Sequence, residues 1–110
     1  MFRTPLHRAP SHPGEILSKD FLEPMNLSQS ELANRLGIPF QRVNQIVRGR
    51  RSVTPDTALR LSKLFGTSVD LWLNLQLACD VYDASHSPNA RDIEKIERLD
   101  TGKLAAAGGR

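Results

Sequence analysis

The 110-residue sequence has few of the residues that build disulfide-rich, metal-binding or membrane proteins. Its one cysteine, Cys79, cannot form an internal disulfide, and no cysteine-rich metal site exists. The three histidines, His7, His12 and His86, share no metal-ligand spacing, so we expect no bound metal. No apolar run approaches the length of a membrane span, and the N-terminus lacks the apolar segment of a signal peptide. We therefore expect no membrane association and a cytoplasmic protein with access to the nucleoid.

Aromatic residues are also scarce, at 5% of the chain, and no segment alternates polar and apolar residues for long. The core must therefore consist mainly of Leu, Ile, Val and Ala, which suits a small helical bundle better than a sheet. The length is enough for one domain with a modest core. A glycine-rich phosphate loop, a nucleophile motif and an acid–base set are all missing, so we expect no cofactor and no enzymatic activity.

The most informative stretch runs from residue 27 to residue 51. Ser28 and Glu31 have the S-x-x-E spacing of a capping box, which predicts the start of a helix. Gly37 suits the positive φ at the end of that helix, and Pro39 cannot continue it but fits the first turn of the next. The pattern predicts two short helices, at about 29–36 and 39–47. The second would bury Val43 and Ile46 and leave a polar outer face, as in a helix-turn-helix.

The spacing of the apolar residues is more specific than a generic helix pair requires. Counted from Gln29, Ala33 is the fifth residue, where two helices would cross closely, and Gly37 is the ninth, where the turn needs positive φ. Apolar residues fill five further places in this register (Leu32, Leu36, Ile38, Val43 and Ile46). An ordinary helical hairpin without a ligand rarely needs that whole set, so the pattern favours DNA binding.

This segment resembles the helix-turn-helix of the XRE/Cro class, the family of lambdoid phage repressors. Four further motifs narrow the resemblance to the HigA/VapI branch of antitoxins over about residues 12–84: 12–15 (HPGE), 49–51 (GRR), 54–61 (TPDTALRL), and 72–76 (WLNLQ) with Asp80. The resemblance implies an all-α fold, a compact five-helix, lambda-repressor-like domain. It also implies an antitoxin that sequesters an mRNA-cleaving toxin and represses its own operon.

The remaining helices complete the predicted domain over residues 12–84. The first begins at Pro13 with His12 as a cap, has Ile16, Leu17 and Phe21 on its inner face, and closes at Pro24. The fourth covers 55–65, where Thr54 is a favourable N-cap and Gly66 ends it. The fifth covers 69–84, with Ser68 and Asp70 at its start.

Two flanking segments lie outside that domain. Residues 1–11 form an N-terminal arm, which is either a loose tail or an arm that places Arg3 and Arg8 in a minor groove. Residues 85–110 form a C-terminal tail, in which Ile93, Ile96 and Leu99 recur every three residues and allow a short helix.

The fifth helix carries two apolar stripes, whereas a peripheral helix of a small domain needs one. Leu73, Leu77 and Val81 form the second stripe. A twin chain packed through this stripe would make a homodimer. The alternative is that the C-terminal tail folds back and covers it.

The outer face of the 39–47 helix supplies the chemistry for reading DNA. Gln41 and Gln45 lie one turn apart, and a glutamine can bond adenine N6 and N7 together. Arg42 is a candidate for guanine and Phe40 for a thymine methyl group. The resemblance implies that Gln41 and Gln45 read bases and that Gln29 grips a phosphate. Four further residues fit phosphate contacts: Asn44, Arg48, Arg50 and Arg51.

The charge distribution agrees with a nucleic-acid face in the first part of the chain. Residues 1–66 contain ten Lys/Arg and five Asp/Glu, or +5, and residues 67–110 contain five and seven, or −2. We therefore predict a homodimer that binds a palindromic operator in double-stranded DNA and has a cognate toxin protein as partner. The rivals are a stand-alone regulator without a toxin and, less favoured, a protein-only binding module.

Overall fold

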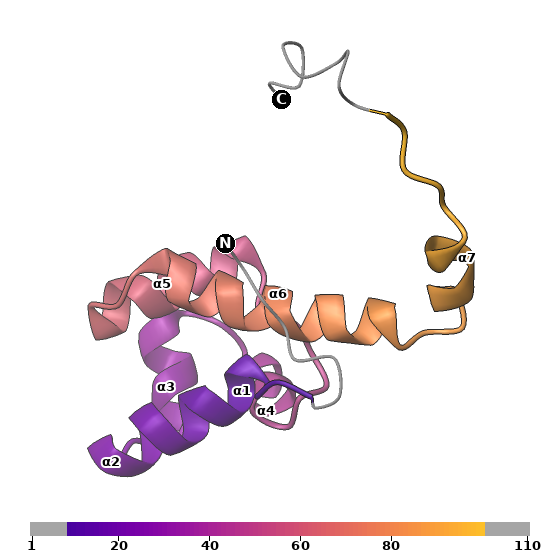
Figure 1. The fold of residues 1–110 in the computed structure, drawn as a ribbon. Helices are drawn as coiled ribbons and strands as arrows, with labels where there is room; N and C mark the ends of the chain where they lie inside the picture. The colour runs from indigo at the N-terminus through magenta and orange to yellow at the C-terminus, as the bar shows by residue number, and fades with distance from the viewer. Residues whose placement is uncertain (1–8, 101–110) are drawn as a thin grey trace.

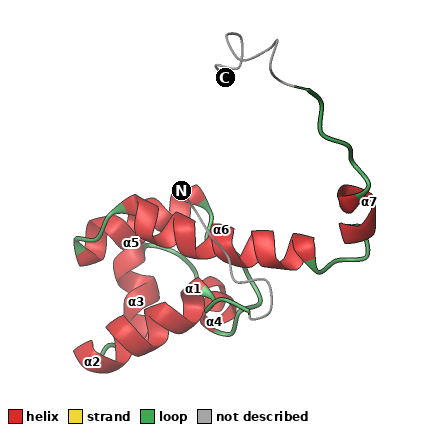
Figure 2. Cartoon of the chain, viewed as in Figure 1, coloured by secondary structure: helices red, strands yellow, loops and turns green. Residues whose placement is uncertain are grey.

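The computed structural model describes residues 9–100, and every regular element in that range is helical (Figure 1; Figure 2). The first helix consists of three consecutive parts, α1 (Pro13–Ile16), η1 (Leu17–Leu22) and α2 (Glu23–Met25). It is followed by α3 (Gln29–Leu36), α4 (Phe40–Val47), α5 (Pro55–Phe65), α6 (Val69–Ser85) and α7 (Ala90–Glu94). The predicted five-helix domain is confirmed, and α7 is the short helix of the tail. Arg3 and Arg8 of the predicted arm, and residues 101–110, lie outside the described residues.

The starts of α3, α5 and α6 follow local chemistry and agree with the sequence-based bounds. The Ser28, Thr54 and Ser68 side chains each accept a hydrogen bond from a backbone N–H three residues later. The Glu31 carboxylate, predicted to return to the helix start, turns instead to Arg35, 3.2 Å away. Gly37 ends α3 with φ 71°, so the tight turn before α4 rests on its left-handed conformation.

The sequence predicts that the first helix closes at Pro24. That prediction is wrong, because the helix continues to Met25 and ends at Asn26, whose φ is 53°. Proline has no N–H to donate, and its ring clashes with the carbonyl four residues earlier in a regular α-helix. Here the helix widens before Pro24 into the π-helical segment η1, in which the Glu23 N–H bonds to the Ser18 carbonyl. Leu17 and Leu22, five residues apart, are both buried as a result.

The core contains aliphatic side chains from every helix of the domain, joined by a small aromatic cluster. Trp72 is fully buried, with the Phe21 ring centroid 5.2 Å from its own, and Phe65 lies 4.8 Å from Phe21. Around this cluster lie the buried hydrophobic residues Leu17, Leu22, Leu32, Ala33, Leu36, Ile38, Val43, Ile46, Val53, Ala58 and Leu61. This core fixes the angle between α3 and α4.

The first helix contacts the end of α4 through bare backbone. A Cβ atom added to Gly14 would lie 1.7 Å from the Ile46 carbonyl oxygen, so only glycine allows this approach. The predicted cap is present, because Nδ1 of His12 accepts a 2.9 Å hydrogen bond from the Gly14 N–H. Desolvation lowers the pKa of His12, and Asp80 and Asp83 partly oppose that shift. The neutral ring is therefore the form that caps α1.

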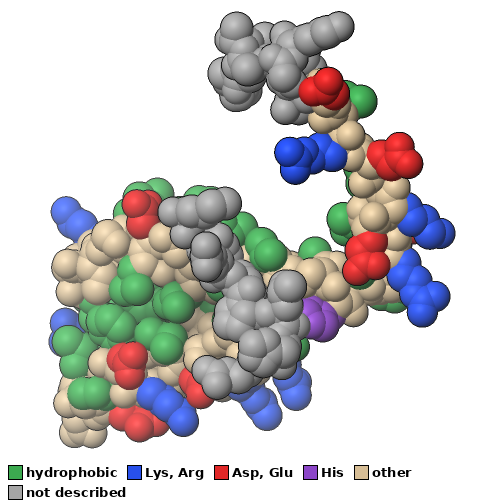
Figure 3. Space-filling model, in the orientation of Figure 1, with side chains coloured by type: hydrophobic (Ala, Val, Ile, Leu, Met, Phe, Trp, Pro, Cys, Tyr) green, Lys and Arg blue, Asp and Glu red, His purple; other side chains and the backbone are tan. Residues whose placement is uncertain are grey.

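The second half of α6 projects beyond the other helices toward α7 (Figure 1). Within α6 only Trp72 and Gln76 are fully buried, whereas Leu77 is 46% and Val81 40% exposed. Hydrophobic side chains are visible along this projecting half in Figure 3. A groove of about 310 Å³ separates it from α7, lined by Val81, Ala84, Ser85, Ala90, Ile93 and Glu94. Within residues 85–100 the tail therefore leaves Leu77 uncovered.

Among residues 9–100, no helix is both long and apolar enough to cross a bilayer.

Candidate nucleic-acid interface

Helix α4 presents its polar face to solvent, as its sequence predicts. Val43 and Ile46 are each 1% exposed and anchor the helix on the core. Gln41 and Gln45, one turn apart, are exposed on the outside, and Phe40 at the start of the helix is 47% exposed. The outer face therefore offers two amides and one apolar ring to a ligand. An α-helix with such a face fits the major groove of B-DNA.

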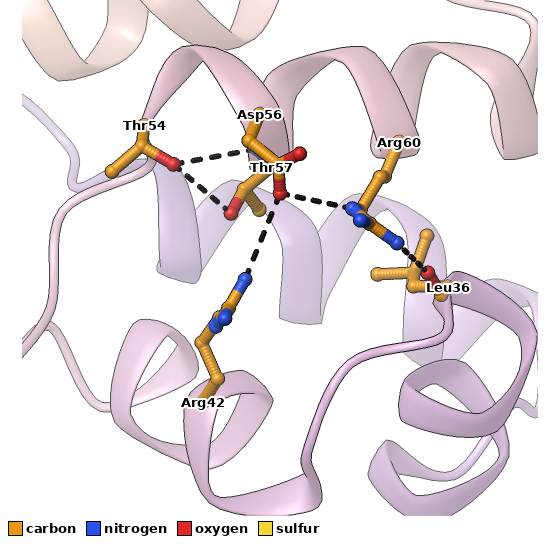
Figure 4. A network of polar contacts seen from close by, with 6 residues as sticks. All are labelled: Leu36, Arg42, Thr54, Asp56, Thr57 and Arg60. Carbon is orange, nitrogen blue, oxygen red and sulfur yellow. Dashed lines mark hydrogen bonds and ion pairs between the residues drawn. The ribbon is translucent and has the colours of Figure 1, made fainter.

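Arg42 lies apart from these residues because it turns toward the start of α5 (Figure 4). Its guanidinium is 3.7 Å from an oxygen of the Asp56 carboxylate, and the side chain is about one-third exposed. The same Asp56 oxygen accepts a 2.9 Å hydrogen bond from Arg60, whose other end donates to the Leu36 carbonyl at the end of α3. This network joins α3, α4 and α5. The sequence predicts that Arg42 lies on the outer face as a candidate for guanine, and it does not predict this contact with Asp56.

Gln29 and Asn44, both predicted to contact phosphate, lie together. Nδ2 of Asn44 donates a 3.0 Å hydrogen bond to Oε1 of Gln29. The bond ties the first residue of α3 to the middle of α4. Because the amide oxygen of Gln29 is used in this contact, its NH₂ group remains as the donor suited to an anion at the start of α3.

The basic loop that follows α4 folds back over the last turn of the helix. Gly49 reverses the chain with φ 73°, and the Arg50 N–H donates a 2.8 Å bond to the Gln45 carbonyl. Nε of Arg51 donates a 2.9 Å bond to the side-chain oxygen of Gln45. Arg48 and Arg50 are exposed at the same end of α4. The structure therefore brings the predicted phosphate residues of the loop beside the predicted base reader Gln45.

Gln76 is a buried side chain that bonds to the end of this loop, and the sequence did not predict this role. Glutamine is usually an exposed residue, yet Gln76 is only 7% exposed. Its Oε1 accepts a 2.8 Å bond from the Val53 N–H, and its Nε2 donates to Asp80 at 3.0 Å. The available signal was its spacing, because Gln76 lies four residues after Trp72 and shares the buried face. Without this amide, the Val53 N–H would be buried with no hydrogen-bond acceptor.

The predicted dimer residues lie on α6, away from this interface. Leu77 and Val81 are on its projecting half, whereas Leu73 packs against the core. Leu73 is half-buried, and Leu77 and Val81 are exposed beside it on α6. No group of three or more metal-ligating side chains gathers within residues 9–100.

Comparison with known proteins places this geometry in a family. The helix-turn-helix family profile matches residues 19–72. Virulence-associated protein I of Dichelobacter nodosus is 45% identical over 82 residues, which cover 74% of this chain and 76% of that protein. A solved addiction-module antidote protein of the HigA family from Coxiella burnetii is 41% identical, with a TM-score of 0.76 over 84% of this chain and all of that one. The Pseudomonas aeruginosa antitoxin HigA, solved with the higBA promoter, is 40% identical, with a TM-score of 0.77 over 82% of this chain and 98% of the other. The chain thus belongs to the XRE/Cro-type helix-turn-helix proteins of the HigA/VapI antitoxin family.

Proposed function

We propose that this protein is a sequence-specific DNA-binding antitoxin of a type II toxin–antitoxin system. In this role it neutralises an mRNA-cleaving toxin and represses its own operon from the nucleoid. The DNA-binding role is supported by the outer face of α4, where Gln41 and Gln45 are exposed. Buried Val43 and Ile46 anchor the opposite face of the same helix on the core. The HigA relatives support the antitoxin part.

Each residue of the interface has a role in this proposal. Phe40, Gln41 and Gln45 contact base edges, and Arg42 reaches a guanine only after its loose 3.7 Å pair with Asp56 opens. The phosphate contacts come from Gln29, Asn44, Arg48, Arg50 and Arg51. Arg51 has donors left for a phosphate because the bond to Gln45 uses only its Nε. The proposal assigns no catalytic step, metal or cofactor to the chain.

A homodimer completes the DNA-binding unit. Leu73, Leu77 and Val81 of α6 would pack against the same residues of a twin chain across a two-fold axis. Two α4 helices would then enter successive major grooves about 34 Å apart and read a palindromic operator. Exposure of Leu77 and Val81 in the monomer supports this arrangement.

Replacing Gln45 by Ala tests the reading face. Specific binding should weaken by roughly 1–3 kcal/mol, and base preference should relax at one symmetric position, because a direct base contact is lost. Footprinting on the DNA upstream of the protein's own operon measures both effects. Asn74→Ala is the control, since Asn74 is an exposed amide on α6, away from α4. Equal affinity and selectivity in the Gln45 variant would show that another face reads DNA.

The antitoxin role is distinguished from a stand-alone regulator by the neighbouring gene. We expect a small basic reading frame just upstream of this one, whose product arrests growth when expressed alone. Co-expression of the full chain should restore growth, and the two proteins should purify together. A neighbour that is harmless alone, and does not purify with the chain, would favour a regulator without a toxin.

A protein-only binding module is a weaker candidate. It would leave the polar face of α4 and the basic loop beside it without a role.

A further inference from the structure

We propose that Arg51 is a positioning residue that sets which base Gln45 reads, and that this base is guanine. The inference rests on the proposed DNA-reading role of α4 and adds the specificity of one position. Two consecutive loop residues hold Gln45: Arg50 bonds its backbone carbonyl at 2.8 Å, and Nε of Arg51 bonds its side-chain oxygen at 2.9 Å. Gln45 is the one residue of α4 held by the loop at both its backbone and its side chain.

The chemistry of arginine fixes which way the Gln45 amide faces. A guanidinium has only donors, so the amide atom that contacts it must be the oxygen. Nε2 of Gln45, with two N–H donors, is then directed away from Arg51. A freely rotating glutamine could turn either end of its amide to a base, and the Arg51 contact removes that choice.

The fixed orientation favours one base edge in the major groove. Bidentate reading of adenine needs the glutamine oxygen to accept from N6 while the NH₂ group donates to N7. Arg51 uses one of the two lone pairs of that oxygen and places a positive charge beside it, which disfavours the approach of the adenine N6 donors. Guanine presents two acceptors, N7 and O6, and no donor on this edge, so it matches an NH₂ group. The Gln45–Arg51 pair should therefore select guanine, whereas Gln45 alone should select adenine.

Binding-site selection with the full chain tests this assignment. The probe is a library of duplexes with a randomised palindromic core, and the readout is the base enriched at each position. Gln45→Ala identifies the position that Gln45 reads, because only that position should lose its preference. The parent should enrich guanine there, and Arg51→Ala should enrich adenine. Competition between matched guanine and adenine duplexes should show a preference of roughly 5- to 150-fold per half-site in the parent, reversed in the variant.

Arg50→Ala is the matched control, because it removes a neighbouring charge of the same loop and leaves the Arg51–Gln45 bond in place. It should lower affinity for all sequences and keep the guanine preference. Three results would overturn the inference: adenine preferred by the parent at the Gln45 position, an unchanged preference in Arg51→Ala, or the same switch in Arg50→Ala. A parent that selects no sequence at all would overturn the proposed function, and the inference with it.

Discussion

Replacing Gly14 by Ala should cost the domain about 3 kcal/mol or more of its free energy of unfolding. The added methyl group would lie 1.7 Å from the backbone oxygen of Ile46, so α1 or the end of α4 must move. Neither neighbour is a flexible side chain that could turn away. A small domain has only about 5–15 kcal/mol in total, so much of its stability would be lost. Urea denaturation followed by circular dichroism measures the change.

Gly66→Ala provides the comparison for this effect. Gly66 has a left-handed backbone conformation, with φ 72°, but no heavy atom lies within 4 Å of a Cβ placed there. Its substitution should cost only about 1–2 kcal/mol, which is the strain of a left-handed alanine. If the two variants proved equally stable, the first helix could not pack against α4 through Gly14.

Replacing Leu77 by Glu should abolish the proposed dimer and leave the fold intact. Leu77 is 46% exposed in the monomer, so a carboxylate there stays solvated and the core is untouched. In a two-fold interface the substitution acts twice, and each buried leucine side chain contributes roughly 1.5–3 kcal/mol. Operator binding should fall together with self-association, because a monomer reads a single half-site. Sedimentation measures the mass, and circular dichroism measures the helix content.

Leu59→Glu is the matched control for that experiment. Leu59 is 59% exposed on α5, outside the stripe of Leu73, Leu77 and Val81, so the variant should remain dimeric. A folded Leu77→Glu protein that still dimerises would place the interface elsewhere. An unfolded one would show that Leu77 belongs to the core.

The helices were predictable because their signals are local. Ser28, Thr54 and Ser68 cap helices through bonds to N–H groups three residues away, and Gly37 ends α3 through its own backbone angle. The face of α4 was predictable for the same reason, since Val43 and Ile46 recur at helical spacing. Such features depend on a few consecutive residues and need no knowledge of the rest of the fold.

Contacts between distant segments could not be predicted in this way. Arg42 turns to Asp56, fourteen residues later, because α5 begins beside α4 in three dimensions. Gln76 is buried because the Val53 N–H, 23 residues earlier, needs an acceptor at that point. The bond between Arg51 and Gln45 depends on how the loop returns after Gly49. From their charge and polarity, these side chains were predicted to be functional candidates or surface residues. Their actual hydrogen bonds and ion pairs depend on residues that only the folded structure brings next to them.

The π-helical turn of η1 affects how this chain is aligned with its relatives. The bond from the Glu23 N–H to the Ser18 carbonyl spans five residues, whereas an α-helical bond spans four. The segment is therefore equivalent to a single-residue insertion absorbed inside a helix. A relative with a regular α-helix here would need its one-residue gap within 17–22. If the gap were placed in the loop before the helix, the residues between the two gap positions would be misaligned by one residue, or about 100° around the helix axis. Gly14 would then be aligned with a residue that faces away from α4.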